Sequence, residues 1–395
     1  MYKIQVLNKI SNKALKKISL DLYDFSPEHT NPDGIIVRSS QIHDMEFGNN
    51  LKAIARAGAG VNNIPIDICR EKGIVVFNTP GANANAVKEL VLTALLLSSR
   101  NIFRSIVWAK ELVGNGDNIQ KFIEKGKKQF IGPEIKGKKL GIIGLGAIGV
   151  MVANSAVQLG MIVSGYDPFI SVEAAWGLSR SVKRTLSLKK LIQNSDYVTI
   201  HVPLNGKTKG MLNKDAFAYM QKGTRLLNFS RGELVDNSDL IDALNNETIS
   251  MYLTDFPNEL LLKQDKVMSF PHLGASTYES EENCTNMALK EIQDYLENGN
   301  IKNSVNYPEC SMERSPGTNR MSIANKNIPN MVGQITSILA ENNINIAEML
   351  NKNKDGFAYN IIDTDSTVTD KVLDKIRSIN GVIKVRRLSN KSISK

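Results

Sequence analysis

Four histidines are the only side chains in this 395-residue sequence whose ordinary pKa suits proton transfer near neutral pH. His29 and His43 fall in early polar stretches, whereas His201 and His272 each follow an apolar run. Ligands of open α/β sheets bind at the carboxyl ends of strands, which favours the later two. His201 stands among strand residues and is interpreted as a buried structural imidazole, so His272 is the candidate general acid/base.

A second chemical signal is the pattern G-x-G-x-x-G, formed by Gly144, Gly146 and Gly149 with Ala147 and Ile148 between the last two glycines. Such glycines allow a tight turn, a close approach of the backbone to a pyrophosphate, and close packing of the following helix. The pattern alone also fits a flexible loop. The apolar run that precedes it and the helical stretch that follows it favour a dinucleotide site.

An acidic residue stands at the end of the next apolar run. Asp167 lies 18 residues beyond Gly149, where a carboxylate can accept hydrogen bonds from ribose hydroxyls and repel a 2′-phosphate. No arginine follows it before Arg180, so NAD is predicted in preference to NADP. A plain turn at Asp167-Pro168 is the alternative.

Short apolar runs that alternate with helical stretches must position these residues, which predicts an α/β fold with a doubly wound parallel sheet. An apolar stretch from residue 86 to 99 is suited to a buried helix that crosses between two lobes, and a helix from residue 276 to about 296 is expected to return the chain to the first lobe. The predicted strands are 34–37, 51–56, 73–78, 139–143, 161–166, 197–202, 225–229 and 251–254.

The last part of the chain has a different pattern. Turn-forming residues over 306–319 predict a linker. Residues 320–395 follow as strand, helix (331–342), strand, strand (357–363), helix (369–379) and strand (382–388). This βαββαβ order is typical of a ferredoxin-like module.

Composition restricts the function classes. The sequence is 42% hydrophobic and 23% charged, with no apolar run of about 20 residues and no export signal at its start, so we expect a soluble chain that does not bind membranes. Three widely spaced cysteines predict a reducing cytoplasm and neither a disulfide framework nor a metal site. The net charge of +9 lacks an aromatic-interleaved basic motif, so nucleic acid is not expected, and a small anionic substrate is favoured.

Three consecutive motifs follow the glycine pattern: residues 196–204 with Thr208, residues 227–236 (Leu-Asn-Phe-Ser-Arg-Gly-Glu-Leu-Val-Asp) and residues 271–277 (Pro-His-Leu-Gly-Ala-Ser-Thr). In this order they resemble the signatures of the D-2-hydroxyacid dehydrogenases, and the resemblance covers nearly all of residues 1–305. It implies hydride transfer between NAD and a 2-hydroxy acid, with Arg231, Glu259 and His272 as the catalytic residues. The chain has Asp255-Phe256-Pro257 before the glutamate, one residue shorter than is usual in the family.

The chemistry explains these residue types. A proton moves between the substrate C2 oxygen and His272, while the fixed charge of Arg231 holds the carboxylate and polarises the carbonyl. Glu259 would favour the protonated imidazole if it contacts the ring. Isolated surface ion pairs are the alternative for Arg231 and Glu259.

The same resemblance implies further contacts. Asp255 matches the family aspartate that contacts the nicotinamide amide, and the other implied cofactor residues beyond the glycine pattern and Asp167 are Pro203, Thr208, Phe229, Ser230 and Gly274. The implied substrate residues are Arg38, Ser39, Gly58, Ala59, Gly60 and Asn83, together with Arg231 and His272. Backbone amides of the glycine-rich turn suit a carboxylate and Arg38 suits a phosphate, although Gly58 and Gly60 also fit a simple turn.

Residues 325–331 and 338–346 resemble an ACT domain, an amino-acid-sensing module. Asn325, Asn327 and Asn345 match effector-binding positions. Asn325 stands where some members have histidine, and Asn330 replaces a usual glycine. The module implies the branch of the family that oxidises 3-phospho-D-glycerate to 3-phosphohydroxypyruvate, at the entry to L-serine synthesis, with serine as a possible effector. A dimerisation module without an effector is the alternative.

These interpretations combine into one architecture. We predict a flavodoxin-like substrate domain (1–99 and 281–305), an inserted Rossmann-type NAD domain (100–280), a linker (306–319) and an ACT domain (320–395), assembled as a homodimer or homotetramer. Two other functions stay open: a reductase for glyoxylate, hydroxypyruvate or another 2-oxo acid, and a non-catalytic NAD-sensing protein that resembles corepressors of this fold.

Overall fold

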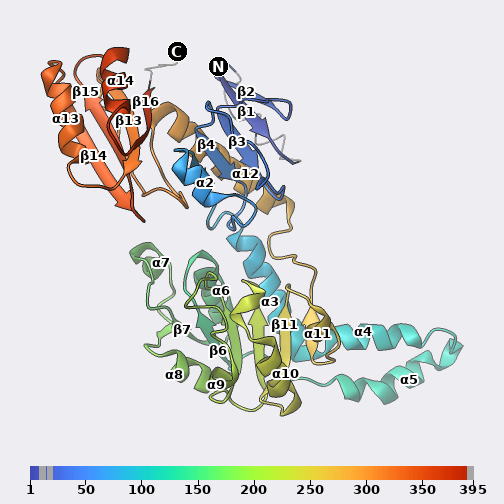
Figure 1. Cartoon of the computed structure of the whole chain (residues 1–395). Helices are drawn as coiled ribbons and strands as arrows, with labels where there is room; N and C mark the ends of the chain where they lie inside the picture. Colours follow the sequence, from blue (N-terminus) through green and yellow to red (C-terminus); the bar gives the residue numbers. More distant parts are fainter. Residues whose placement is uncertain (9–14, 16–20, 389–395) are drawn as a thin grey trace. The chain divides into compact units, whose positions relative to one another are not determined.

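The computed structural model describes residues 1–8, 15 and 21–388 and divides the chain into two compact units. Unit 1 comprises residues 1–83 and 278–395, and unit 2 comprises residues 84–277 (Figure 1). Both units are α/β, as the alternation of apolar runs and helical stretches predicts.

Unit 1 begins with a five-stranded parallel sheet in the order β2-β1-β3-β4-β5. This is the flavodoxin-like order, so the predicted class of the first lobe is confirmed. The central strands are short and wholly or nearly buried because both faces are covered, which explains their continuous apolar sequences. The strands are β1 (Tyr2–Val6), β2 (Tyr23–Ser26), β3 (Gly34–Val37), β4 (Ala53–Arg56) and β5 (Val75–Phe77), with helix α2 (Ile66–Glu71) before β5.

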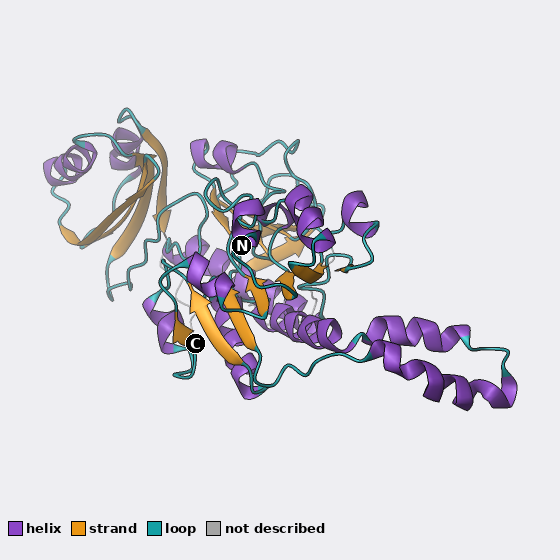
Figure 2. Ribbon diagram, turned by 90° about the horizontal axis from the view of Figure 1, so that it is seen from below, coloured by secondary structure: helices purple, strands orange, loops and turns teal. Residues whose placement is uncertain are grey.

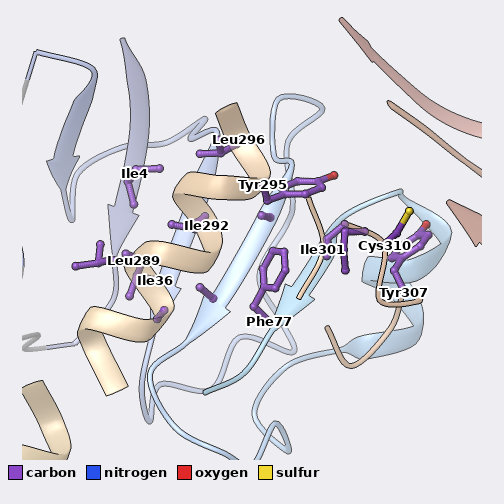
Figure 3. Packing of buried hydrophobic residues seen from close by; sticks show 14 of the residues in the cluster. Ile4, Ile36, Phe77, Leu289, Ile292, Tyr295, Leu296, Ile301, Tyr307 and Cys310 are labelled. Carbon is purple, nitrogen blue, oxygen red and sulfur yellow. The ribbon is translucent and has the colours of Figure 1, made fainter. Parts of the chain in front are cut away.

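The returning helix α12 (Tyr278–Asn298) packs on this sheet. Figure 3 shows its apolar face, with Leu289, Ile292 and Leu296 directed at the strands that carry Ile4 and Ile36. The acidic residues of its first turn suit the positive end of the helix dipole. The helix thus ties residues far apart in the sequence into one core.

The C-terminal module of unit 1 has an antiparallel sheet in the order β14-β15-β13-β16, which is the arrangement expected of a βαββαβ module. Its elements are β13 (Asn319–Lys326), α13 (Met331–Glu341), β14 (Ile346–Lys354), β15 (Phe357–Thr364), α14 (Asp370–Arg377) and β16 (Val382–Leu388). A cluster of apolar side chains from β13, both helices and β15 forms its core.

This module is continuous with the first sheet of unit 1. Tyr359 and Ile361 of β15 belong to the same buried cluster as Tyr295 of α12, and Arg386 of β16 donates hydrogen bonds to the carbonyl oxygens of Tyr295 (3.1 Å) and Leu296 (2.8 Å). Residues 306–312 of the predicted linker are also packed, with Tyr307 and Cys310 buried beside Ile301 (Figure 3).

Unit 2 contains a seven-stranded parallel sheet in the order β12-β11-β10-β9-β6-β7-β8, the Rossmann order with one added strand. The predicted Rossmann-type fold is therefore confirmed. The strand order reverses between β6 and β9, whose carboxyl ends are the expected ligand edge. The strands are β6 (Lys139–Ile143), β7 (Ile162–Tyr166), β8 (Lys183–Arg184), β9 (Tyr197–Ile200), β10 (Thr224–Asn228), β11 (Ile249–Thr254) and β12 (Val267–Ser269).

The sheet of unit 2 is accompanied by short helices and by the long helix α3 (Ala84–Arg100). The apolar run predicted to cross between lobes forms most of α3, and its buried residues Val87, Val91, Ala94 and Leu95 share a core with α6. Its packing places α3 in unit 2, whereas the sequence placed the first domain boundary after residue 99. The other helices are α6 (Ala147–Gln158), α7 (Val172–Trp176), α8 (Leu188–Gln193), α9 (Lys214–Phe217), α10 (Asn237–Asn245) and α11 (Glu259–Leu262).

A helical arm extends from unit 2 after α3. It consists of α4 (Ile102–Glu111) and α5 (Ile119–Gly126), which run side by side away from the sheet in both views (Figures 1 and 2). Neither helix contains a buried residue. Trp108 of α4 packs against Phe130, with ring centroids 5.3 Å apart.

Among the helices in the described ranges, no single one has both the length and the apolar composition to span a bilayer; α3 and α4 meet that measure only as a pair bent by 62°.

Candidate active site

The glycine pattern forms the turn between β6 and α6. Gly144 has φ +92°, and a Cβ there would lie 2.6 Å from the carbonyl oxygen of His201. A Cβ at Gly149 would lie 2.0 Å from the carbonyl oxygen of Gly144, whereas one at Gly146 would meet nothing within 4 Å. Two glycines therefore close the turn and the third leaves open space at the helix N-terminus, which fits a dinucleotide pyrophosphate.

Asp167 follows β7 and is fixed beside this turn. Its carboxylate accepts hydrogen bonds from the backbone amides of Leu145 and Phe169, each at 2.8 Å. The acid is thereby held next to the glycine pattern, where a ribose would lie.

Hydrogen bonds and ring packing connect the loops that follow the carboxyl ends of β9, β10 and β12. Ser230 Oγ donates to the carbonyl oxygen of Ile200 (2.8 Å), and Thr208 Oγ1 donates to that of Pro203 (2.6 Å). The rings of Phe229 and Phe270 lie 5.9 Å apart. Four of the predicted cofactor residues thus take part in the contacts that shape this edge.

Asp255 lies directly after β11 and is 1% exposed. Its Oδ2 accepts a hydrogen bond from the amide of Gly274 (3.0 Å), and its carbonyl oxygen accepts one from the amide of His272 (3.1 Å). Burial raises the pKa of its carboxyl group, while the Gly274 hydrogen bond and the charges of His272 and Arg231 oppose that rise. The imidazole and the guanidinium are thus both close enough to act on one buried carboxylate.

The second oxygen of Asp255 is an orphaned acceptor. Asp255 Oδ1 is buried and has no hydrogen-bond partner among the described residues. A buried unsatisfied acceptor costs free energy of about 1 to 3 kcal/mol unless a ligand or water supplies a donor. Asp255 Oδ1 therefore suits an N–H donor, such as the amide of a nicotinamide ring.

His272 has φ +37°, a left-handed conformation that is unfavourable for a residue other than glycine. The side chain is exposed, and its ring packs against Phe256 with centroids 5.0 Å apart. The loop therefore presents an accessible imidazole in a defined place. His201 differs, because burial lowers its pKa to about 4 and keeps it neutral near pH 7.

Arg231 is positioned by the end of β10. Asn228 Nδ2 donates to the carbonyl oxygen of Arg231 (2.8 Å), and Arg231 Nη1 donates to that of Ser230 (2.6 Å). The residue is only partly exposed. Its guanidinium keeps further donors available for a carboxylate.

Glu259 is placed differently from the other two predicted catalytic residues. It is the first residue of the short helix α11, its side chain is 83% exposed, and its Oε1 accepts a hydrogen bond from Lys263 Nζ (2.6 Å). No hydrogen bond or ion pair joins it to His272 in the described part of the chain. The structure therefore brings together Arg231, His272 and Asp255, and leaves Glu259 paired with Lys263, the residue that follows α11.

The glycine-rich turn of unit 1 follows β4. The carbonyl oxygen of Gly58 accepts a hydrogen bond from the amide of Thr79 (3.1 Å), and that of Ala59 accepts one from Asn78 Nδ2 (2.6 Å). The amides of Ala59, Gly60 and Val61 donate to no acceptor within residues 1–8, 15 and 21–388. Successive free amides of this kind can bind an anion.

Arg38 follows β3 and pairs with an acid of α12. Its Nη1 lies 2.5 Å from Glu281 Oε1, and both side chains are partly exposed. Asn8 Oδ1 accepts hydrogen bonds from the amides of Arg38, Ser39 and Ser40 at 3.0 to 3.2 Å. Asn8 thereby holds the loop that carries the two predicted substrate residues.

Three comparisons place the chain among known proteins. Residues 94–277 match the family model of the NAD-binding domain of D-isomer specific 2-hydroxyacid dehydrogenases. D-3-phosphoglycerate dehydrogenase of Haemophilus influenzae is 31% identical over 361 residues, which cover 87% of this chain and 83% of the relative. The Escherichia coli K12 enzyme of the same name is 34% identical over 351 residues, covering 86% and 82%. The chain belongs to the D-isomer specific 2-hydroxyacid dehydrogenase family.

A solved structure supports the same assignment. The NAD-bound 3-phosphoglycerate dehydrogenase of Entamoeba histolytica is 29% identical, has a TM-score of 0.61, and is matched over 77% of this chain and 98% of that one. This member of the 2-hydroxyacid dehydrogenase family is therefore an NAD-dependent oxidoreductase, as the glycine pattern and Asp167 predict. When bound, NAD supplies the hydride acceptor for such a reaction.

The predicted effector residues of this dehydrogenase lie in the C-terminal module. Asn325 is 1% exposed, and its Oδ1 accepts a hydrogen bond from Asn360 Nδ2 (2.8 Å). Asn345 Nδ2 donates to Asp365 Oδ2 (2.5 Å), and the amide of Asn327 donates to the carbonyl oxygen of Gly356 (2.9 Å). Asn325 therefore belongs to a buried amide network, whereas Asn327 and Asn345 lie nearer the surface.

The sequence interpretation missed Asn8, Asn78 and Glu281, which contact the predicted substrate residues. Asn78 is the last residue of the predicted strand 73–78, and polar residues at strand ends often face a ligand edge, so its position was a usable signal. The partners of Asn8 and Glu281 are more than 29 residues away, and no local pattern indicates them. Asn83 is the last residue of unit 1 before α3.

Proposed function

We propose that this dehydrogenase oxidises 3-phospho-D-glycerate to 3-phosphohydroxypyruvate with NAD, as the first step of L-serine synthesis. The observation that carries the proposal is that unit 1 offers two anion-binding groups: the free amides of residues 59–61 for a carboxylate, and Arg38 for a phosphate. The names of the bacterial relatives support the same substrate.

His272 and Arg231 carry the chemistry in this proposal. His272 accepts the proton of the C2 hydroxyl as hydride leaves C2, and Arg231 holds the carboxylate and stabilises charge on the C2 oxygen. Asp255 keeps the loop of His272 in place through its hydrogen bonds to the amides of His272 and Gly274. A catalytic role for Glu259 stays a prediction, and it requires the carboxylate to leave Lys263.

The test is a panel assay that follows NADH absorbance. The purified chain is given NAD with 3-phospho-D-glycerate, D-glycerate, D-lactate or glycolate, and in reverse NADH with hydroxypyruvate or glyoxylate. We expect 3-phospho-D-glycerate to give the highest kcat/KM of the four hydroxy acids. A preference for an unphosphorylated acid would assign a different 2-oxo-acid reductase, and no turnover with any compound would favour a non-catalytic NAD sensor.

We also propose that the C-terminal module is an ACT domain that binds serine. The βαββαβ order and the surface positions of Asn327 and Asn345 support this assignment. Addition of L-serine to the same assay tests it, with D-serine as the control. Inhibition by both enantiomers, or by neither, would contradict a specific serine site.

The helical arm supports a homodimer that forms through unit 2, with pairing of the C-terminal modules as a route to a tetramer. Apolar side chains lie exposed along the arm, which is unusual for a monomer. They are Phe103 (58% exposed), Ile106 (50%), Val107 (44%), Val113 (83%) and Phe122 (41%). A second copy of the chain is the occupant that we propose for this surface.

The three cysteines support a reducing compartment. Cys69, Cys284 and Cys310 are free and buried, so none is placed to form a structural disulfide. We therefore propose that the enzyme acts in the cytoplasm.

A further inference from the structure

Asn78 joins the glycine-rich turn to a segment that lies more than 200 residues away in the sequence. Its side-chain Nδ2 donates to the carbonyl oxygen of Ala59 (2.6 Å), and its backbone amide donates to the carbonyl oxygen of Asn303 (3.3 Å). One residue is thus bonded both to the proposed carboxylate site and to the chain that follows α12.

That chain forms a strap along β5, which we define as residues 303–306. Ser304 pairs with Phe77 in an antiparallel bridge, and the amide of Val305 donates to the carbonyl oxygen of Val76 (3.0 Å). The side chain of Asn306 accepts from the amide of Val76 (2.9 Å) and donates to the carbonyl oxygen of Ile74 (2.8 Å). The strap therefore extends the sheet beyond its last strand.

Asn303 anchors the strap to α12. It has φ +55°, and its Nδ2 donates to Glu291 Oε1 (2.6 Å). Glu291 is 8% exposed, and its other carboxyl oxygen has no partner among the described residues. Among the described residues, Asn303 thus supplies the side-chain hydrogen bond to this buried carboxyl group, which makes the contact costly to lose.

Because peptide groups are planar, hydrogen bonds that hold the carbonyl oxygens of the glycine-rich turn also fix the direction of its amides. In a trans peptide the carbonyl of one residue and the amide of the next point in opposite directions. Since Thr79 and Asn78 hold the carbonyl oxygens of Gly58 and Ala59, the amides of Ala59 and Gly60 point away from residues 78 and 79. Rotation of either peptide would turn an amide away from a bound carboxylate.

We propose that Asn78 and Asn303 are positioning residues, which hold the amides of the glycine-rich turn in the orientation that binds the substrate carboxylate. This inference rests on the proposed function, because it takes residues 59–61 to be a substrate site. Neither residue touches the reacting atoms. Their loss should therefore weaken substrate binding and leave the chemical step and NAD binding nearly unchanged.

The experiment compares three full-length variants in the NADH assay. Asn303→Gly keeps the positive φ and removes the bond to Glu291. Asn78→Ser removes the donor to Ala59 at the other end of the link. Asn298→Ala is the matched control, because Asn298 Nδ2 also bonds a carboxylate of α12, Asp294 Oδ1 (2.9 Å), in a contact that does not reach the strap.

We expect Asn303→Gly and Asn78→Ser each to raise KM for the 2-hydroxy acid about tenfold, the scale of one lost neutral hydrogen bond in a binding step. The kcat and the KM for NAD should change less than about twofold, and the control should match the wild type. An unchanged KM for the hydroxy acid in either variant that keeps its cooperative thermal transition overturns the inference. A fall in kcat and a rise in the KM for NAD that are as large as the rise in the KM for the hydroxy acid also overturn it, because they indicate a general loss of structure.

The wild-type chain separates this inference from the proposed function. If it reduces NAD with another 2-hydroxy acid and not with 3-phospho-D-glycerate, the proposed substrate is wrong. The KM values of the wild type and the variants are then measured with the acid that the wild type accepts. If 3-phospho-D-glycerate is accepted and the variants keep its wild-type KM, the substrate stands and the strap has no positioning role.

Discussion

Arg38 Nη1 lies 2.5 Å from Glu281 Oε1, so the cation proposed to bind the substrate phosphate already holds a counter-ion. Both side chains are about one-third exposed or more, and such pairs contribute roughly 0 to 1 kcal/mol. A dianionic phosphate can therefore displace Glu281 at low cost. While Glu281 stays charged, it also disfavours binding through repulsion of the phosphate.

Glu281→Gln should lower the KM for 3-phospho-D-glycerate, because it removes a competing carboxylate and keeps the shape of the side chain. We expect a decrease of about two- to fivefold, matching the free energy of one exposed ion pair. Steady-state kinetics at low ionic strength measure it, and the difference should shrink as salt is added. A KM that rises in this variant would show that Glu281 orients Arg38 rather than competing with the substrate.

His272→Ala should lower kcat by about 10² to 10⁴ if the imidazole is the general acid/base. NAD affinity, followed by fluorescence or calorimetry, should stay near the wild-type value, because the glycine turn and Asp167 bind the dinucleotide. His29→Gln is the control, since His29 contacts Asp24 at the edge strand β2. Undiminished turnover in His272→Ala would reject the assignment.

The helical arm is expected to form the interface between two copies of the chain. Replacement of Ile106 and Val107 by aspartate puts two charges on an apolar exposed face, where they would be desolvated in a dimer. We expect light scattering after gel filtration to show a wild-type dimer or tetramer and a variant of half that mass. Identical masses would exclude this surface as the interface.

Burial of Glu291 should make stability depend on pH. Burial raises the pKa of its carboxyl group from 4.5 to about 8. The native state therefore binds one more proton than the unfolded state between these values, and stability falls with rising pH by about 1.4 kcal/mol per pH unit from this group. The contribution of Glu291 to the free energy of unfolding is fully present below pH 4.5 and is lost by about pH 8.

Glu291→Gln removes this titration and keeps an acceptor for Asn303. Denaturant unfolding between pH 5 and pH 8 should give a shallower pH dependence in the variant than in the wild type, with the two proteins most alike at the acid end. Parallel curves across the whole range would show that the carboxyl group is already ionised, and hydrated, at neutral pH.

The parallel sheets and the dinucleotide turn could be predicted because their signals are local. Apolar runs mark β3 and β6, and the glycine spacing around Gly144 reports a turn that only glycine can adopt. The pairing of Arg38 with Glu281 and the strap at Asn303 could not be predicted, because each joins residues hundreds of positions apart.

Glu259 shows the limit of a resemblance between motifs. The motif carries it over as the residue that contacts the imidazole, yet its side chain in the structure bonds Lys263, the residue that follows α11. That i, i+4 pairing of glutamate and lysine was readable from the sequence. The side-chain conformation depends on such local competition, which a motif does not encode.

The union of the C-terminal module with the first sheet was also beyond sequence reasoning. Arg320 of β13 is 1% exposed; it donates hydrogen bonds to the carbonyl oxygens of Asn298 (3.3 Å) and Met312 (2.8 Å) outside the module, and it pairs with Asp363 inside it (2.6 and 2.8 Å). A charged pair gives no apolar signal, although it lies in the interior. The predicted linker likewise reads as polar, whereas Tyr307 and Cys310 within it are buried.

Cys310 makes the contact between the C-terminal module and the segment after α12 measurable by chemical labelling. Its thiol lies within 4.0 Å of the carbonyl oxygens of Leu350 and Tyr359, and burial raises its pKa to about 12. An alkylating reagent needs the exposed thiolate, so it can modify Cys310 only in molecules in which the segment that carries Cys310 has separated from β14 and β15. The rate of labelling at this residue therefore reports how readily that segment separates from the C-terminal module, and a ligand that stabilises their contact should slow the labelling.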